Sequence, residues 1–408
     1  MRSNQSIGLT ELLTILTLTL LVTAPRAVAQ HETVLFSFGG NNQNGTLPQS
    51  SLILDAAGNL YGTTIWTNEY GYGTVFELMP QPGGGWTEKV LHTFSDNGGG
   101  TYPLCNLIFD ASGNLYGTTA AGGIYNFGTV FELSPMPDSS WTEKTLHSFN
   151  HNGHDGYDPY AGVTFDASGN LYGMTPTGGT YDYGVVFELS PQASGGWSEQ
   201  VLHSFNNNGK DGYTPYDGLV VDAAGNLYGT TYYGGAYTYG TVFELKRQAA
   251  GNWGEKILHN FTNSGTDGDG PLGGLTFDGA GNLYGSTING THGTVFELTP
   301  TASGNWTQKI LTTLLASHTA LAFDNAGNLY FTLAYGGAYS YGAVIELTPQ
   351  ANGAWSAMTL HSFSNIGKDG LYPNGVIVDA SGNVFGTTNL GGAFFDGFDG
   401  GTVFEITP

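Results

Sequence analysis

Short apolar runs alternate with glycine-rich turns along almost the whole chain, and the same pattern returns at nearly constant intervals. In one interval, residues 215–261, the apolar runs are 219–221, 227–231, 240–245 and 253–261. β-Branched and aromatic residues are frequent in these runs, as is typical of strands. The segment from Asp222 to Asn226 has the composition of a hairpin turn, with Gly225 able to take the left-handed conformation. Each interval therefore predicts four short antiparallel strands.

The turn motif Asp-x-x-Gly-Asn marks the repeat most clearly. It occurs seven times, and its first residues are Asp55, Asp110, Asp166, Asp222, Asp278, Asp324 and Asp379. A four-strand unit with a period of 46 to 56 residues is typical of a β-propeller blade.

The two ends of the repeat complement each other. The last copy stops after its third strand, at residues 401–406, and residues 32–38 match the fourth-strand pattern of residues 88–94. A linear array would leave the N-terminal strand as an exposed edge, which soluble proteins avoid. We therefore predict an all-β fold: a seven-bladed β-propeller of four-stranded antiparallel blades, closed by the N-terminal strand, which completes the last blade.

The full repeat unit is Asp-Ala-x-Gly-Asn-Leu-Tyr-Gly-Thr-Thr followed by Gly-Gly-x-Tyr-x-Tyr-Gly-Thr-Val-Phe-Glu-Leu, and residues 166–190 and 222–245 carry it most completely. This unit resembles the GloVer (Gloeo/Verruco) tandem-repeat family of exported bacterial proteins, and the resemblance covers essentially the whole mature chain. It implies secretion and a repeat architecture, and it implies no established enzymatic activity or ligand.

Residues 1–29 have the features of a secretory signal peptide. Arg2 supplies the positive start, residues 12–22 form a short apolar run, and residues 27–29 form a small-x-small cleavage site. The apolar run is too short to cross a bilayer readily as a permanent transmembrane helix. An uncleaved membrane anchor is the alternative interpretation. We predict that residues 30–408 form a single propeller domain, exported to the periplasm or the cell exterior, with no stable membrane span after signal cleavage.

The charge of the chain narrows its partners. Acidic residues number 33 against 10 basic ones, and loss of residues 1–29 changes the formal net charge from −23 to about −24. The negative electrostatic field of such a chain repels phosphate backbones and anionic lipids. Nucleic acid is therefore not expected as a partner. Neutral glycans, cations and cationic surfaces fit better, and a monomer is expected. Cys105 is the only cysteine, so no disulfide within the chain braces the fold.

The loops from strand two to strand three, and those between blades, share one face of a propeller. Here these loops combine aromatic rings with Asn, Asp and Gly, which suits a surface for a glycan or another polar ligand. The candidate ligand-binding residues are Trp66, Tyr70, Tyr125, Tyr181, Tyr237 and Tyr339. In the alternative interpretation, each tyrosine packs on the Gly-Gly turn of its own repeat.

The inter-blade loops also carry a repeated Asp-Gly pair. No cofactor is evident, but these loops offer carboxylate and carbonyl oxygens of the kind that bind Ca²⁺. The candidate metal ligands are Asp155, Asp211, Asp267 and Asp369. Capping of the loops by the aspartate side chains explains the same residues without an ion.

Glutamate and histidine recur once in most repeats. The third strand carries Glu77, Glu132, Glu188, Glu244, Glu297, Glu346 and Glu405, and the fourth strand carries His92, His147, His203, His259 and His361. A cation ring is one interpretation, but residues spread around a ring do not converge on one ion. We predict instead that the glutamates pair with lysines on the fourth strand, such as Lys144 opposite Glu132. We expect the histidines to be hydrogen-bonded packing residues.

The fifth period is shorter than the others. Its 46 residues lack parts of two loops on the same face, at residues 286–294 and 315–319, which would leave a notch in the rim between blades five and six. His292 and His318 lie in these loops outside the repeated pattern. We hypothesise that they flank a ligand path; a tolerated deletion is the alternative.

These features favour a secreted binding or interaction module for a glycan or another polar ligand. The first strands carry no acid, base or nucleophile, and the chain has no Gly-x-Ser-x-Gly or His-Glu-x-x-His motif. The alternative is a lyase-like or glycoside-hydrolase-like propeller enzyme with its site near the notch. A pocket that joins His292 and His318 to nearby acids would favour the enzyme.

Overall fold

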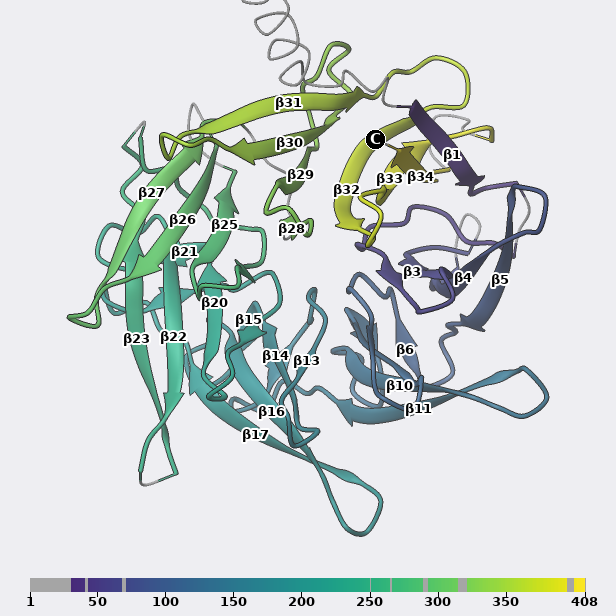
Figure 1. Cartoon of the computed structure of the whole chain (residues 1–408). Coiled ribbons are helices and arrows are strands. Elements are labelled where there is room, and N and C mark those ends of the chain that lie inside the picture. The colour runs from purple at the N-terminus through teal and green to yellow at the C-terminus, as the bar shows by residue number, and fades with distance from the viewer. Residues whose placement is uncertain are drawn as a thin grey trace, which may run out of the picture.

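The computed structural model describes residues 31–40, 43–67, 71–249, 251–264, 266–288, 293–314, 321–394 and 400–407. Within these ranges the chain forms seven four-stranded sheets arranged in a ring around an axis (Figure 1). The predicted seven-bladed β-propeller is therefore confirmed. Among the described residues no helix has the length and apolar character needed to cross a membrane. The predicted signal peptide, residues 1–29, lies outside the described ranges, so its cleavage and the export of the protein stay predictions.

The first four blades have the same strand lengths. Blade 1 contains β2 (Ile53–Leu54), β3 (Leu60–Thr64), β4 (Thr74–Pro80) and β5 (Trp86–Thr93). Blade 2 contains β7 (Ile108–Phe109), β8 (Leu115–Thr119), β10 (Thr129–Pro135) and β11 (Trp141–Ser148). Blade 3 contains β13 (Thr164–Phe165), β14 (Leu171–Thr175), β16 (Val185–Pro191) and β17 (Trp197–Ser204). Blade 4 contains β19 (Val220–Val221), β20 (Leu227–Thr231), β22 (Thr241–Arg247) and β23 (Trp253–Asn260).

Blade 6 keeps these strand lengths, whereas blades 5 and 7 differ from them. Blade 5 contains β24 (Thr276–Phe277), β25 (Leu283–Thr287), β26 (Thr294–Pro300) and β27 (Trp306–Thr312). Blade 6 contains β28 (Ala322–Phe323), β29 (Leu329–Leu333), β30 (Ala343–Pro349) and β31 (Trp355–Ser362). Blade 7 contains β32 (Gly370–Val378), β33 (Val384–Gly391), β34 (Thr402–Thr407) and β1 (His31–Ser37). Three two-stranded ladders join inter-blade loops to the next blade: β6 (Gly100–Thr101) with β9 (Ala121–Gly122), β12 (Gly156–Tyr157) with β15 (Thr177–Gly178), and β18 (Gly212–Tyr213) with β21 (Tyr233–Gly234).

An aspartate-centred turn joins the first two strands of each blade. In blade 4, Asp222 Oδ1 accepts the backbone N–H groups of Ala224 and Asn226 at 2.8 and 2.9 Å. Its Oδ2 accepts the side-chain amide of Asn226 at 2.7 Å and the hydroxyl of Tyr228 at 3.1 Å. Burial alone would raise the pKa of Asp222, but these hydrogen bonds to the ionised form hold its pKa below the ordinary value. The repeated motif is therefore a structural turn, and Gly225 supplies its positive φ of 81°.

The core lies between adjacent blades. Phe205 of blade 3 packs edge-on against Phe243 of blade 4, with their ring centroids 5.3 Å apart and both rings fully buried. The same contact recurs at five other junctions, as Phe38–Phe76, Phe94–Phe131, Phe149–Phe187, Phe261–Phe296 and Phe363–Phe404. Each blade therefore buries its apolar surface only when its neighbours are present.

A glycine in the second strand makes room for the core phenylalanine. A Cβ atom at Gly229 would lie 2.7 Å from Cζ of Phe243, closer than packed atoms approach each other. Blade 6 reverses the two sizes: Phe331 takes the glycine position and pairs with Ile345, which takes the phenylalanine position. The exchange of a large and a small residue across one strand pair keeps the core volume nearly constant.

The N-terminal strand closes the ring, as predicted. β1 pairs antiparallel with β34, with His31 opposite Thr407 and Ser37 opposite Thr402 (Figure 1). The next residue, Phe38, is fully buried against Phe76 of blade 1. The first segment of the propeller therefore completes blade 7 and then continues directly into the junction with blade 1.

The lysines of the fourth strand have the predicted register, but most do not make the predicted contacts. Glu132 pairs with Lys144 in the ladder, yet Lys144 Nζ donates to the Gly195 carbonyl of the next blade at 3.2 Å. Among the described residues, Glu297 and Lys309 form the one cross-strand ion pair of this kind, at 3.6 Å. The ion-pair prediction is therefore wrong at Glu132, because the long lysine side chain reaches across the junction instead.

Candidate ligand-binding site

The loops that enter the first strands share one conformation. In blade 4, Thr214 takes a positive φ of 57° immediately before Pro215, and its N–H donates to the Tyr183 carbonyl of blade 3 at 3.0 Å. The same φ, between 56 and 59°, is found at the matching residues Leu47, Tyr102, Asp158 and Tyr372. Non-glycine residues adopt this region only where the surrounding structure holds them there. We call these segments the inner loops.

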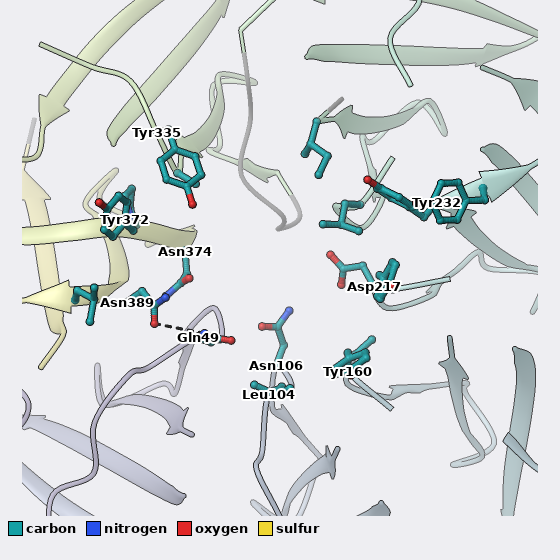
Figure 2. Close-up of a pocket in the computed structure, with 18 residues that line it drawn as sticks. Gln49, Leu104, Asn106, Tyr160, Asp217, Tyr232, Tyr335, Tyr372, Asn374 and Asn389 are labelled. Carbon is teal, nitrogen blue, oxygen red and sulfur yellow. Dashed lines mark hydrogen bonds between the residues drawn. The ribbon is translucent and has the colours of Figure 1, made fainter. Parts of the chain in front are cut away.

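The inner loops surround a cavity of about 940 Å³ (Figure 2). All seven blades contribute to its lining, through residues that include Gln49, Asn106, Tyr160, Asp217, Leu272, Tyr335 and Asn374. Only a space on the propeller axis can be reached from every blade. We therefore call it the axial cavity.

Tyrosines form two walls of the axial cavity. On one side, the Tyr216 ring centroid lies 6.0 Å from that of Tyr160 and 5.7 Å from that of Tyr232. On the other side, the centroids of Tyr335 and Tyr372 lie 5.4 Å apart, and Figure 2 shows this pair across the cavity from Tyr232. Phenol rings that face a cavity offer both apolar faces and hydroxyl groups to a ligand.

Amide side chains lie between the two walls. Asn374 Nδ2 donates to the Pro48 carbonyl at 2.7 Å, and Asn106 Oδ1 accepts the backbone N–H of Ser51 at 2.8 Å. These bonds to neighbouring blades fix the amides in place, and Figure 2 shows the amide of Asn106 directed into the cavity. The lining therefore presents fixed neutral donors and acceptors.

Asp217 is the one carboxyl group among the described lining residues. It accepts the N–H of its neighbour Gly218 at 2.6 Å and the N–H of Gly274, in blade 5, at 2.5 Å. Desolvation by burial raises the pKa of Asp217 to about 6, although both backbone hydrogen bonds act in the opposite direction. Figure 2 shows its carboxyl group pointing toward the middle of the cavity.

The predicted aromatic residues lie elsewhere. Tyr125, Tyr181, Tyr237 and Tyr339 are between 54 and 56% exposed, and Trp66 packs against Tyr102 with centroids 6.4 Å apart. None of these five residues lines the axial cavity. We call the four exposed tyrosines the rim tyrosines; a role for them and for Trp66 in ligand binding stays a prediction. Tyr70, His292 and His318 lie outside the described residues, and so does most of the predicted notch.

The cavity-lining residues were missed because they occupy a variable position of the repeat. The residue after the inner-loop proline is Gln49, Leu104, Tyr160, Tyr216, Leu272 or Asn374. A search for repeated residues passes over such a position. The available signal was the proline that six of the seven blades share, which marks the chain segment that meets the axis.

Three of the four predicted calcium ligands lie in clusters of potential ligands at the blade junctions, and the fourth, Asp267, is hydrogen-bonded to His259 at 2.8 Å. His147 and Asp155 of one blade meet Glu199 of the next, His203 and Asp211 meet Glu255, and His361 and Asp369 meet Glu32. Within each cluster, one donor atom from every residue lies within 4.8 Å of the others. We call these the junction clusters.

The histidines of the junction clusters are hydrogen-bonded, as predicted. Since a carboxylate can only accept, the Nε2–H groups of His147 and His203 donate to Asp155 and Asp211, at 3.1 and 3.2 Å. The same Asp155 oxygen accepts the backbone N–H of Asn150 at 3.0 Å, so the aspartate also caps its own loop. Loop capping is therefore confirmed at this position.

The surroundings of the glutamates in the junction clusters favour their protonated form. Burial first, and then the Asp155 carboxylate, raise the pKa of Glu199 to about 7, while His147 lowers it. Oδ1 of Asp155 and Oε1 of Glu199 are both buried and have no hydrogen-bond partner among the described residues. A proton shared between the two carboxyl groups would give both atoms a hydrogen-bond partner. At the junction of blades 4 and 5, Gln308 takes the position of the glutamate. Its side-chain amide can donate a hydrogen bond, as a protonated glutamate does.

Calcium at Asp155, Asp211, Asp267 and Asp369 stays a prediction. If calcium binds there, EDTA is expected to lower the melting temperature of the protein by several degrees, and excess calcium is expected to restore it. EDTA saturated with calcium serves as the control. A melting temperature that neither EDTA nor calcium changes would remove calcium from the account.

Solved structures of other proteins share the fold at low sequence identity. A virginiamycin B lyase from Staphylococcus aureus has a TM-score of 0.54 and 14% identity, and the alignment covers 93% of this chain and 99% of that one. A streptogramin B lyase has a TM-score of 0.55 and 12% identity, with 94% and 99% covered. A protein from Lactobacillus plantarum has a TM-score of 0.51 and 17% identity, with 85% and 98% covered. These likenesses show the fold alone. A search of curated proteins finds no match.

The sequence of this chain also matches a family model. The model described as the Gloeobacter/Verrucomicrobia repeat matches residues 22–164 and 137–317, which is more than half of the chain. The matched residues include five of the seven aspartate turns, the inner loop that carries Asp217, and two of the three junction clusters. The resemblance of the repeat unit is thereby confirmed, and the chain belongs to the Gloeobacter/Verrucomicrobia repeat family.

Proposed function

We propose that this propeller is a secreted binding module that holds a saccharide in the axial cavity. The observation that carries the proposal is the lining: tyrosine walls on two sides, with fixed asparagine and glutamine side chains between them. Sugar rings stack their C–H faces on aromatic rings and exchange hydrogen bonds with amides. The volume of about 940 Å³ lies within the range of small-molecule sites.

An enzyme of the lyase or glycoside-hydrolase kind is the second candidate. The observation that favours it is Asp217, whose pKa of about 6 suits proton transfer near neutral pH. Two structural relatives are named as lyases, of virginiamycin B and of streptogramin B. Most glycoside hydrolases, however, use two carboxyl groups that flank the scissile bond. Among the described lining residues Asp217 has no second carboxyl beside it, so binding is the function we favour.

A glycan array tests the binding function directly. The chain that begins at Gln30 is expected to bind a restricted set of saccharides. For each saccharide that binds, Tyr335→Ala is expected to weaken the affinity about two- to ten-fold, because it removes one aromatic wall residue that is 68% exposed. Tyr335→Phe keeps the ring and is the matched control. Failure of every saccharide to bind, or equal affinity of Tyr335→Ala, would count against the proposal.

A further inference from the structure

Asp217 gives the axial cavity a negative charge that no described lining residue balances. The described lining contains tyrosines, amides and aliphatic residues, but no Lys, Arg or His. The two groups that bond to the Asp217 carboxylate are backbone N–H groups, from Gly218 and Gly274, which carry no net charge. Buried charges in proteins are usually paired, so a cationic group of a ligand would complement this carboxylate.

The fold does not require a charge at this position. In the matching inner loops the same position is held by Ser50, Cys105, Ala161 and Gly273. Ser50 Oγ and Cys105 Sγ accept backbone N–H groups from the second strand of their own blade, those of Thr63 and Thr118. Asp217 reaches instead to the next blade. The inner-loop conformation therefore does not explain why this position carries a charge in blade 4.

A neutral side chain makes an equivalent bond between blades elsewhere around the axis. Asn106 Oδ1 accepts the N–H of Ser51 from the neighbouring blade at 2.8 Å, as Asp217 Oδ2 accepts the N–H of Gly274. An asparagine at position 217 could make the same kind of bond. What aspartate adds is the negative charge that Figure 2 shows facing the cavity.

The tyrosine wall favours the same kind of ligand group. Tyr216 is adjacent to Asp217, and its ring lies between those of Tyr160 and Tyr232. The faces of phenol rings attract cations, and an ammonium group gains most when it is desolvated beside them. The formal net charge of −23 also raises the local concentration of cationic ligands.

We infer that the saccharide bound in the axial cavity carries a protonated amine, and that Asp217 binds this ammonium group beside the tyrosine wall. This inference rests on the proposed function, because it names the chemical class of the ligand for the same cavity. The ligand class is an amino sugar with a free amine, as opposed to a neutral or N-acetylated sugar.

Three trisaccharides separate the inference from the proposed function: a glucosamine trimer, its fully N-acetylated form and a glucose trimer of the same linkage. Calorimetric titration of the chain from Gln30 at pH 7 is expected to show at least about ten-fold tighter binding of the glucosamine trimer. Asp217→Asn is expected to remove this preference, so that the glucosamine trimer binds no more tightly than the two neutral trimers. Added salt is expected to weaken binding of the glucosamine trimer only.

Each outcome has one meaning. If the neutral trimers bind as tightly as the glucosamine trimer, or if Asp217→Asn keeps the preference, the amine inference is overturned and the binding function stands. If none of the three trisaccharides binds, the amine inference is overturned, and the glycan array decides the binding function separately. Should Asp217→Asn not fold, the pH profile of the wild-type chain decides: below about pH 6, protonation of Asp217 is expected to abolish the preference for the glucosamine trimer. A preference that persists at pH 5 overturns the inference.

Discussion

A chain that begins at Gly39, and so lacks β1, is expected to be less stable than the chain from Gln30 by at least about 4 kcal/mol. The deletion removes the outer strand of blade 7 and leaves β34 as an exposed edge. It also removes Phe38, which is fully buried against Phe76 of blade 1. Loss of a buried phenylalanine side chain alone costs about 3 to 5 kcal/mol. Urea unfolding followed by tryptophan fluorescence measures the difference.

A synthetic peptide provides the control for this deletion. If the lost stability comes from the missing strand, a peptide of residues 31–40 is expected to restore it by pairing with β34. The same peptide with Phe38→Ala is expected to restore less, because the buried ring is missing. Equal stability of the two chains without peptide would show that the ring does not depend on β1 for closure.

The free energy of unfolding is expected to fall by about 2 to 4 kcal/mol as the pH rises from about 5 to about 8. Burial raises the pKa of Glu88 to about 7, and burial with the Asp155 carboxylate raises that of Glu199 to about 7, from the ordinary 4.5. The pKa of Glu255 is raised as well, by burial and by the Asp211 carboxylate.

The sign follows from which state binds more protons. Between pH 4.5 and about 7 the folded chain keeps protons on Glu88 and Glu199 that the unfolded chain has lost, so stability decreases as the pH rises. His92 opposes this below its ordinary pKa of 6.5, because burial lowers its pKa and favours the neutral form in the folded chain. The raised glutamates outnumber it, and above pH 6.5 His92 has little further effect.

Two substitutions test the origin of the pH dependence. Glu199→Gln and Glu255→Gln reproduce the arrangement of Gln308 at the junction of blades 4 and 5, and together they are expected to remove much of the slope. Glu297→Gln removes a carboxylate of the ion pair with Lys309, outside the junction clusters, and is expected to leave the slope in place. Chemical unfolding at a series of pH values gives the comparison. An unchanged slope in the double variant would contradict the shared proton.

The fold could be predicted from the sequence because the same turn motif and strand pattern occur seven times. The aspartate of each turn and the complementary ends of the chain both follow from local geometry and strand pairing. The lysine contacts could not be predicted this way. A register argument places Lys144 opposite Glu132, but the position of Gly195 in the next blade depends on how the blades pack.

The candidate site was hidden for a related reason. The position of the rim tyrosines holds tyrosine in most repeats, so a search for repeated residues finds it, whereas the axial cavity is lined by positions that differ between blades. Asp217 is a single departure from small residues at its position, and it follows directly after a tyrosine that also lines the cavity. The junction clusters combine residues of neighbouring repeats, so they do not show within one repeat. One sign of these clusters in the sequence is that the histidine and the glutamate are absent together at one junction. At the junction of blades 5 and 6, Thr312 replaces the histidine and Ala357 replaces the glutamate.

The central claim is that the axial cavity, and not the surface formed by the rim tyrosines, binds the ligand. The most direct test is to measure the affinity of one array-selected saccharide for two variants of the chain. Ala334→Trp places an indole in the cavity lining, and it is expected to weaken binding at least about ten-fold. A variant with Tyr125, Tyr181, Tyr237 and Tyr339 all changed to Ala is expected to bind within about two-fold of the wild type. Loss of binding in the rim variant, with binding intact in Ala334→Trp, would contradict the account.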